Sequence, residues 1–175
     1  MNRSIAEQRF REIVPPLLDD AYSLAKWLSH SPTDAEDIVQ EAAIRALSAL
    51  EGAEIAKPKA WALSLVRNTA LTYMARKRPG MLAFIGDLDD LEALDYVFDS
   101  ARNAEETLIA EQTGVRVRDA IAALPSPLKE TLIMREINEL DYKEIAEATG
   151  APLGTVMSRL ARARAAIARA LKDLK

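Results

Sequence analysis

The chain has 175 residues, of which 49% are hydrophobic, 29% charged and only 5% aromatic. This is a globular composition, and abundant Ala and Leu with few aromatic residues favour packed helices over a β-sheet. Zero cysteines exclude disulfides, thiolate metal sites and a cysteine nucleophile, and His30 is the only histidine. We therefore expect an all-α protein with no catalytic residue, metal, cofactor or small-molecule substrate.

The charge is unevenly distributed along the chain. Residues 1–80 carry 11 basic and 10 acidic groups, residues 81–111 carry 1 and 9, and residues 112–175 carry 11 and 8. The net charge of -4 therefore comes from the acidic middle, while the last 21 residues hold six basic groups against one acidic group. A basic C-terminal helix of this kind is typical of contact with phosphates. No run of 18 apolar residues and no signal-like start is present, so we expect a cytoplasmic protein without membrane insertion.

Helical signals fill the first 79 residues. A helical pattern runs from Arg3 to about His30, and Pro15-Pro16 begins a second helix within it or kinks a single long one. Thr33, three residues before Glu36, predicts a capping box and a helix to about residue 51. The next helix is predicted from residue 58 to residue 77, where a Pro-Gly pair stops it. Residues 1–79 are thus expected to form one helical bundle.

Two further segments follow. Residues 80–103 lack a sustained helical period and are strongly acidic, which predicts an interdomain linker. Fully extended, some 24 residues span roughly 80 Å, enough for two domains to lie two DNA turns apart. A second domain is predicted over residues 104–175, with one helix to Leu124, another with Ser126 as N-cap, and two more separated by Gly150.

The stretch from Asp141 to Leu160 predicts a helix-turn-helix. Asp141 can cap the first helix with Glu144 three places on, and Gly150 suits a left-handed turn residue. At 100° per residue, Val156, Leu160, Ala163, Ile167 and Leu171 form the core stripe of the last helix. The candidate DNA-binding residues lie on its other sides, with Arg159 and Arg164 as flanking phosphate clamps: Thr155, Ser158, Arg159, Arg162, Arg164 and Arg169. The alternative is an ordinary basic surface helix.

The helix expected after Thr33 presents an acidic face with an exposed Ile. Such a face suits a protein partner with a basic, partly apolar groove. The candidate residues are Asp34, Asp37, Gln40, Glu41 and Ile44, with Arg45 beside them. A solvated charged face with a stray Ile explains the periodicity equally well.

The helix from residue 58 combines a Trp, small polar residues and a basic end along one side. That combination suits single-stranded DNA, where a base is stacked or held by its edges. The candidate residues are Trp61, Ser64, Asn68, Thr72, Arg76, Lys77 and Arg78. The rival interpretation places Trp61 in the core.

Taken in order, these segments resemble a known family. The run from Asp34 to Glu41 looks like the core-polymerase-binding motif of sigma region two, and Lys59 to Ala70 looks like its promoter-melting helix. Residues 124–164 are similar to sigma region four. The order of these motifs, the missing region three and the acidic linker resemble the extracytoplasmic-function group of the sigma-70 family.

The resemblance implies partners and roles. It implies that Asp37, Gln40 and Glu41 meet the clamp helices of core RNA polymerase. It also implies that Asn68 holds a flipped minus-10 base of promoter DNA, and that Ser158 and Arg162 read the minus-35 element. An anti-sigma factor is expected to hold such a protein inactive. Met157 and Ala161 depart from the family pattern, so shape readout of DNA is expected to matter more here.

Three alternative functions are also compatible with the sequence. A sigma-like decoy would bind an anti-sigma factor but not DNA, and the retained Trp61, Asn68 and arginines argue against it. An ordinary helix-turn-helix regulator would bind duplex DNA without polymerase. An enzyme is the most distant alternative, resting only on paired carboxylates such as Asp89 and Asp90.

Overall fold

The computed structural model describes residues 2–52, 54–79 and 109–172. Within these ranges the regular structure is helical and no strand occurs, so the expected all-α class is confirmed. The segment interpreted as a linker, residues 80–103, lies outside the described residues. None of the described helices is long and apolar enough to cross a membrane.

The N-terminal half is a bundle in which α2, α3 and α4 pack on one another. Its core includes Leu24, Ile38 and Leu63, all fully buried. The double proline neither extends α1 nor begins α2 but forms a separate 3-10 turn between them. The elements of this half are α1 (Asn2–Ile13), η1 (Pro15–Leu17), α2 (Leu18–Ser29), α3 (Pro32–Ala49) and α4 (Pro58–Lys77).

The start of α3 differs from the prediction. The N-cap is Ser31, whose hydroxyl accepts a hydrogen bond from the Asp34 backbone N–H at 3.3 Å. Pro32 occupies the first helical position, where its fixed φ and missing N–H fit a helix start. Thr33 and Glu36 therefore lie inside the helix, and the predicted capping box between them is wrong.

The C-terminal half contains the predicted helix-turn-helix. Its helices are α6 (Ile109–Ala123), α7 (Ser126–Glu136), α8 (Tyr142–Thr149) and α9 (Leu153–Lys172). Helix α7 begins one residue earlier than predicted, with Pro125 rather than Ser126 at the N-cap. On α9, Val156, Leu160 and Ala163 are buried as the periodicity predicts.

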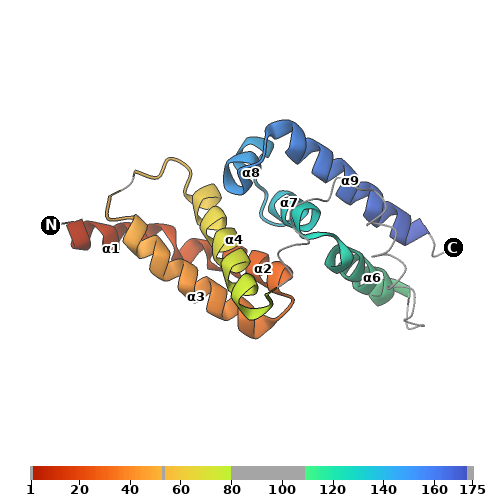
Figure 1. Cartoon of the computed structure of the whole chain (residues 1–175), viewed down its shortest axis with the longest axis horizontal. Coiled ribbons are helices and arrows are strands. Elements are labelled where there is room, and N and C mark those ends of the chain that lie inside the picture. Colours follow the sequence, from red (N-terminus) through yellow and green to blue (C-terminus); the bar gives the residue numbers. More distant parts are fainter. Residues whose placement is uncertain (1, 53, 80–108, 173–175) are drawn as a thin grey trace.

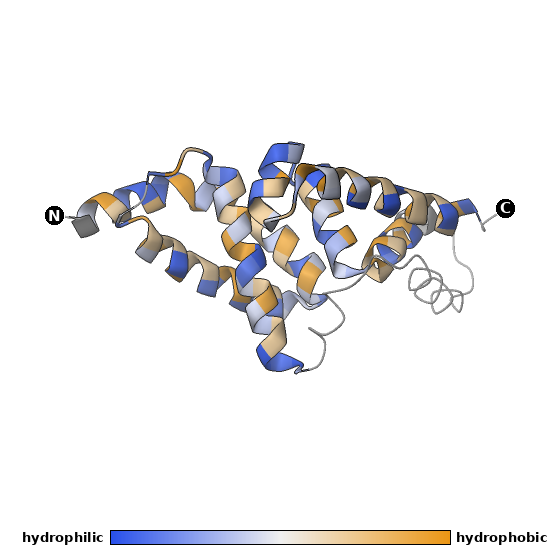
Figure 2. Ribbon diagram, turned by 45° about the horizontal axis from the view of Figure 1, so that its top comes forward, coloured by the Kyte–Doolittle hydropathy of each residue, from blue (hydrophilic) through white to orange (hydrophobic). Residues whose placement is uncertain are grey.

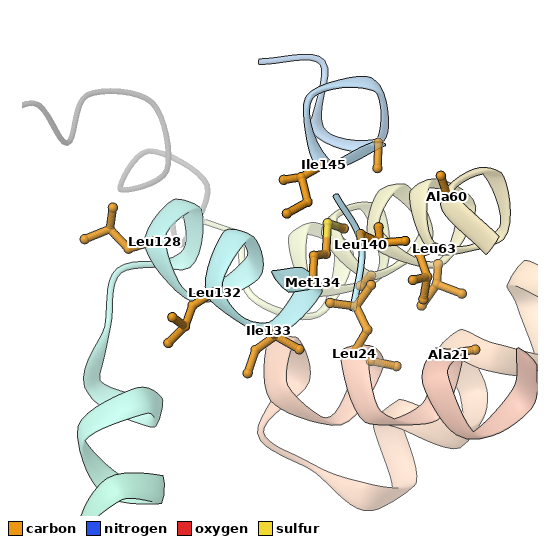
Figure 3. Packing of buried hydrophobic residues seen from close by; sticks show 14 of the residues in the cluster. Ala21, Leu24, Ala60, Leu63, Leu128, Leu132, Ile133, Met134, Leu140 and Ile145 are labelled. Atoms are coloured by element: carbon orange, nitrogen blue, oxygen red, sulfur yellow. The ribbon is translucent and has the colours of Figure 1, made fainter. Parts of the chain in front are cut away.

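The two halves pack directly on each other in an elongated body, with α1 and the C-terminal part of α9 toward opposite ends (Figure 1). Helix α4 contacts α8, and α2 contacts α7. We call the surface at which α2 and α4 meet α7 and α8 the seam. Figure 3 shows Leu24 and Leu63 of the N-terminal half facing Met134, Leu140 and Ile145 of the C-terminal half within one buried cluster. The chain is thus in a closed arrangement, in which the first helix of the helix-turn-helix lies against α4.

Candidate nucleic-acid interface

Local hydrogen bonds fix the entry into the helix-turn-helix. Asp141 Oδ1 accepts from the Glu144 N–H at 2.8 Å, and Glu144 Oε2 accepts from the Asp141 N–H at 2.8 Å. The predicted capping box of α8 is therefore present. Arg135 donates to the Leu140 carbonyl at 2.9 Å, and its guanidinium lies 5.3 Å from the centre of the Tyr142 ring. These contacts hold the loop before α8 in a single path.

Gly150 ends α8 in the left-handed conformation, with φ of 70°. Replacing it with alanine meets no neighbouring atom, so only the backbone is strained. We expect Gly150→Ala to lower the free energy of unfolding by about 1 to 2 kcal/mol, measured by denaturant titration. Gly154→Ala on α9 is the matched control, because that position is also open but has no positive φ; there we expect a gain of about 0.5 kcal/mol. Equal effects at both glycines would contradict the argument.

Helix α9 presents its candidate DNA-binding residues unequally. Ser158 and Arg169 are exposed, and Thr155 and Arg162 are half-buried. Beside them runs an apolar strip whose members are four residues apart, Leu153, Met157 and Ala161; Leu153 is 42% and Met157 53% exposed. The accessible face of α9 is therefore polar with an apolar strip.

Two of the arginines predicted as phosphate clamps are paired with acidic residues of α7. An Arg159 guanidinium nitrogen lies 4.0 Å from Glu130 Oε1. Arg164 donates to Glu136 Oε1 at 2.6 Å, and this hydrogen bond raises the pKa of Arg164. The Arg164 pair is half-exposed, so it contributes little stability and a DNA phosphate can replace it. The sequence predicts Arg159 and Arg164 as two equivalent phosphate clamps, but it does not predict their acidic partners on α7.

On α4, Asn68 is the exposed member of the candidate single-strand face, while Trp61, Ser64 and Thr72 are half-buried. The Asn68 side-chain oxygen accepts from Arg67 at 3.2 Å, and the Thr72 hydroxyl donates to the Asn68 carbonyl at 2.9 Å. Trp61 is neither a core residue nor fully exposed, so it can offer part of its ring to a base. The last turn of α4 and the residue after it carry three exposed cations, and Figure 2 shows this end as strongly hydrophilic: Arg76, Lys77 and Arg78.

The candidate partner face on α3 is accessible. Asp37 and Gln40 are exposed, and Ile44 is 69% exposed, the largest value among the exposed large hydrophobic residues of the described ranges. Glu41 is half-buried and forms an ion pair with Arg45. A second cation, Arg76 of α4, lies 3.7 Å from the same carboxylate oxygen.

Asp34 does not belong to this exposed face. Its side chain is buried and accepts hydrogen bonds from Lys77 at 2.5 Å and from the Tyr73 hydroxyl at 3.1 Å. The Lys77 hydrogen bond is the largest cause of the lowered pKa of Asp34. Burial, with hydrogen bonds to Asp37 and Asp34, raises the pKa of Tyr73 to about 12. Asp34 thus joins α3 to α4, and the expectation that it widens the exposed patch is wrong.

An ion pair across the seam is absent from the sequence-based predictions. Arg67 of α4 donates to Glu130 of α7 through Nε at 2.7 Å and through a terminal nitrogen at 3.0 Å. Both side chains are largely buried. No local signal reveals this pair, since the two residues are 63 positions apart. The sequence hints at a role for Arg67 because this residue directly precedes Asn68 on the candidate DNA-binding helix.

Comparison with known proteins follows the same division. The sigma-70 region 2 family matches residues 14–79, and the sigma-70 region 4 family matches residues 114–167. The ECF RNA polymerase sigma-E factor of Escherichia coli K12 is 34% identical over 139 residues, which cover 77% of this chain and 72% of that protein. The chain is an extracytoplasmic-function (ECF) sigma factor of the sigma-70 family. A further relative, the ECF sigma factor SigW of Bacillus subtilis, is 26% identical over 96% of this chain and 91% of that protein.

The fold of this sigma factor is shared by solved structures. The sigma factor RpoE of Bartonella quintana, in complex with the anti-sigma factor NepR, has a TM-score of 0.68 at 22% identity and covers 94% of this chain and 98% of that chain. CnrH, in complex with the cytosolic domain of CnrY, has a TM-score of 0.65 at 19% identity and covers 98% and 97%. The shared fold therefore extends over both halves.

A histidine and a lysine of this sigma factor meet at the edge of the seam. His30 Nε2 lies 2.8 Å from the Nζ of Lys129, which is 4% exposed. Burial lowers the pKa of Lys129 to about 8. Burial, followed by the charges of Lys129 and Arg78, lowers the pKa of His30. A protonated His30 would therefore face two cations.

Acidification is expected to destabilise this contact. Because the pKa of His30 is lower in the folded chain than its ordinary 6.5, the unfolded chain binds more protons near that pH. The melting temperature should therefore fall as the pH decreases through about 6.5, whereas Lys129, protonated in both states below pH 8, adds no slope there. His30→Asn, which tolerates the left-handed φ of 57°, is expected to flatten this dependence. An unchanged pH profile in that variant would contradict the assignment.

Proposed function

We propose that this sigma factor docks on the clamp helices of core RNA polymerase through α3, binds the minus-35 element with α9 and captures unpaired minus-10 bases with α4. The observation that carries the proposal is the exposed Asn68, whose side-chain oxygen accepts from Arg67, seven residues after the half-buried Trp61 and therefore on the same side of α4. An exposed amide on the same side of a helix as a partly accessible aromatic ring suits a base that has left the duplex. Capture of unpaired bases supplies the free energy of melting, so the proposed mechanism breaks no covalent bond.

The core-binding role is assigned to the accessible part of the α3 face. An apolar Ile44 surrounded by Asp37, Gln40 and Glu41 offers a central contact with a polar rim, which is the usual anatomy of a protein interface. Asp34 supports this face from below through Tyr73 and does not touch the polymerase itself. Because core polymerase and promoter DNA are the proposed partners, we place the factor in the cytoplasm.

The deciding experiment adds the purified chain to core polymerase and measures promoter-dependent transcription. A transcript that requires the chain and no other factor is the expected result. Absence of transcript together with tight binding to an anti-sigma factor would indicate a sigma-like decoy. Duplex DNA binding that is independent of polymerase would indicate an ordinary helix-turn-helix regulator.

An anti-sigma partner is part of the proposal. The RpoE structure that shares this fold contains an anti-sigma factor, and this chain holds no cysteine with which to sense redox change by itself. A separate inhibitory protein would supply the regulation. Its binding should suppress transcription in the assay above without altering the catalytic activity of core polymerase.

Arg162 is proposed to read a base of the minus-35 element. If its guanidinium contacts guanine with two hydrogen bonds, Arg162→Ala should weaken binding to the cognate upstream element by roughly 1 to 3 kcal/mol and leave nonspecific binding nearly unchanged. Fluorescence anisotropy with cognate and scrambled duplexes measures both. The matched control is Arg164→Ala, whose half-exposed side chain is proposed as a phosphate contact and should lose affinity for both duplexes alike. The same uniform loss in Arg162→Ala would assign that residue to phosphate as well.

A further inference from the structure

One buried carboxylate lies between arginines of the two candidate DNA-binding helices. Glu130, on α7, forms two hydrogen bonds with Arg67 of α4, and Arg159 of α9 lies 4.0 Å from its Oε1. The Glu130 side chain is 3% exposed, against 16% for Arg67 and 26% for Arg159. Glu130 therefore pairs with a cation of each helix, and of these two pairs only the one with Arg67 depends on the closed arrangement.

The three residues divide unequally between the halves. Glu130 and Arg159 both belong to the C-terminal half, whereas Arg67 belongs to the N-terminal half. If the halves separate, Glu130 keeps Arg159 as its counterion, so no buried carboxylate is left uncompensated. Arg67 loses its two charged hydrogen bonds and keeps the contact with the Asn68 side-chain oxygen. Its guanidinium then lies ready for a bidentate phosphate contact next to Asn68.

We propose that Glu130 is an intramolecular competitor of promoter DNA: in the closed arrangement it occupies Arg67, and on opening it keeps Arg159 and releases Arg67 to a DNA phosphate. This inference rests on the proposed role of α4 in minus-10 binding. Arg67 thereby joins the candidate DNA-contacting residues. The closed arrangement acts directly on the minus-10 site of α4, because it withholds Arg67 from DNA.

The other polar contacts across the seam lack this property. Asn138 donates to the Asp20 carboxylate at 2.9 Å, and Lys57 lies 3.3 Å from Glu147 on exposed side chains. His30 and Lys129 also meet at the edge of the seam. None of these pairs includes a candidate DNA-binding residue. A buried ion pair adds little net stability compared with an apolar pair in its place, whereas loss of one partner leaves the other charge uncompensated and is destabilising. The Arg67–Glu130 pair therefore makes the closure responsive to a competing anion.

The test follows the opening of the free chain. Because the chain has no cysteine, Lys57→Cys and Glu147→Cys place two unique thiols on opposite sides of the seam for a pair of fluorescent dyes. This reporter background removes only an exposed ion pair, which contributes little. In this reporter background, Glu130→Gln should raise the fraction of chains with separated halves by about tenfold, which is measured as reduced energy transfer between the dyes. Glu136→Gln, which alters a pair confined to the C-terminal half, is the matched control and should leave the transfer unchanged.

Competition between Glu130 and DNA for Arg67 is tested with a short single-stranded DNA of mixed sequence as the probe. Glu130→Gln should bind it roughly tenfold more tightly than the parent chain, and adding Arg67→Gln should abolish that gain. An unchanged open fraction in Glu130→Gln overturns the proposal. A gain in DNA affinity that persists without Arg67 overturns it as well.

A second variant covers the case in which Glu130→Gln unfolds the C-terminal half. Arg67→Gln removes the pair from the other side and leaves Glu130 with Arg159, so it should open the chain without any gain in DNA binding. Energy transfer that stays at the parental value would contradict the inference. These measurements use neither polymerase nor a promoter, so their failure is distinguishable from failure of the proposed function, which the transcription assay reports.

Discussion

Asn68→Ala is expected to slow open-complex formation on a duplex promoter by roughly 10- to 100-fold while leaving the affinity for core polymerase unchanged. The reason is that contacts to an unpaired base contribute about 1 to 3 kcal/mol, and this free energy is gained only after the duplex opens. Asn68 is exposed on α4, whereas the candidate core-binding residues lie on α3. Permanganate footprinting measures melting, and fluorescence anisotropy measures core binding.

Two controls separate base capture from general damage. On a promoter that is already unpaired over the minus-10 element, the Asn68→Ala defect should shrink, because melting no longer depends on base capture. Gln40→Ala removes another exposed amide, on α3, and should show the reverse pattern, with weaker core binding and little effect once the complex has formed. An equal loss of melting and core binding in Asn68→Ala would remove the base-capture role.

The elements that the sequence predicts well are those with local signals at both ends. Helix α4 spans Pro58–Lys77 as predicted, because a proline fits its first turn and a Pro-Gly pair follows it. The entry and exit of α8 are also as predicted, since the capping box and the left-handed glycine act within a few residues. At α3, by contrast, Ser31 and Thr33 are both good caps, and Pro32 at the first helical position decides between them.

The faces of the helices follow from periodicity, but the partners of the charged side chains do not. The exposure of Ile44 and Asn68 can be predicted from the 3.6-residue period alone. The burial of Asp34 cannot, because it depends on Tyr73 and Lys77, about 40 residues further along the chain. The Arg67–Glu130 pair depends in addition on how the two halves pack, which a linker without a helical period does not determine.

Linking the two halves covalently is expected to abolish transcription. The charged groups of Lys57 and Glu147 lie 3.3 Å apart across the seam, so Lys57→Cys and Glu147→Cys can be joined by a short bis-methanethiosulfonate, which forms a reducible disulfide with each cysteine and releases methanesulfinate. Two DNA turns between the promoter elements correspond to about 70 Å, which α4 and α9 cannot span while α4 packs against α8. Promoter-dependent transcripts should therefore fall to background and return when the linker is reduced.

The same linked chain is expected to retain core binding. The α3 face, with Asp37, Gln40 and Ile44, is exposed in the closed arrangement, so the polymerase can reach it without separation of the halves. Loss of core binding on linking would mean that opening precedes docking, and full transcription by the linked chain would refute the need for opening. Core binding without transcription indicates that the closed factor docks first and opens on the polymerase, where release of Arg67 from Glu130 coincides with delivery of Asn68 to the promoter.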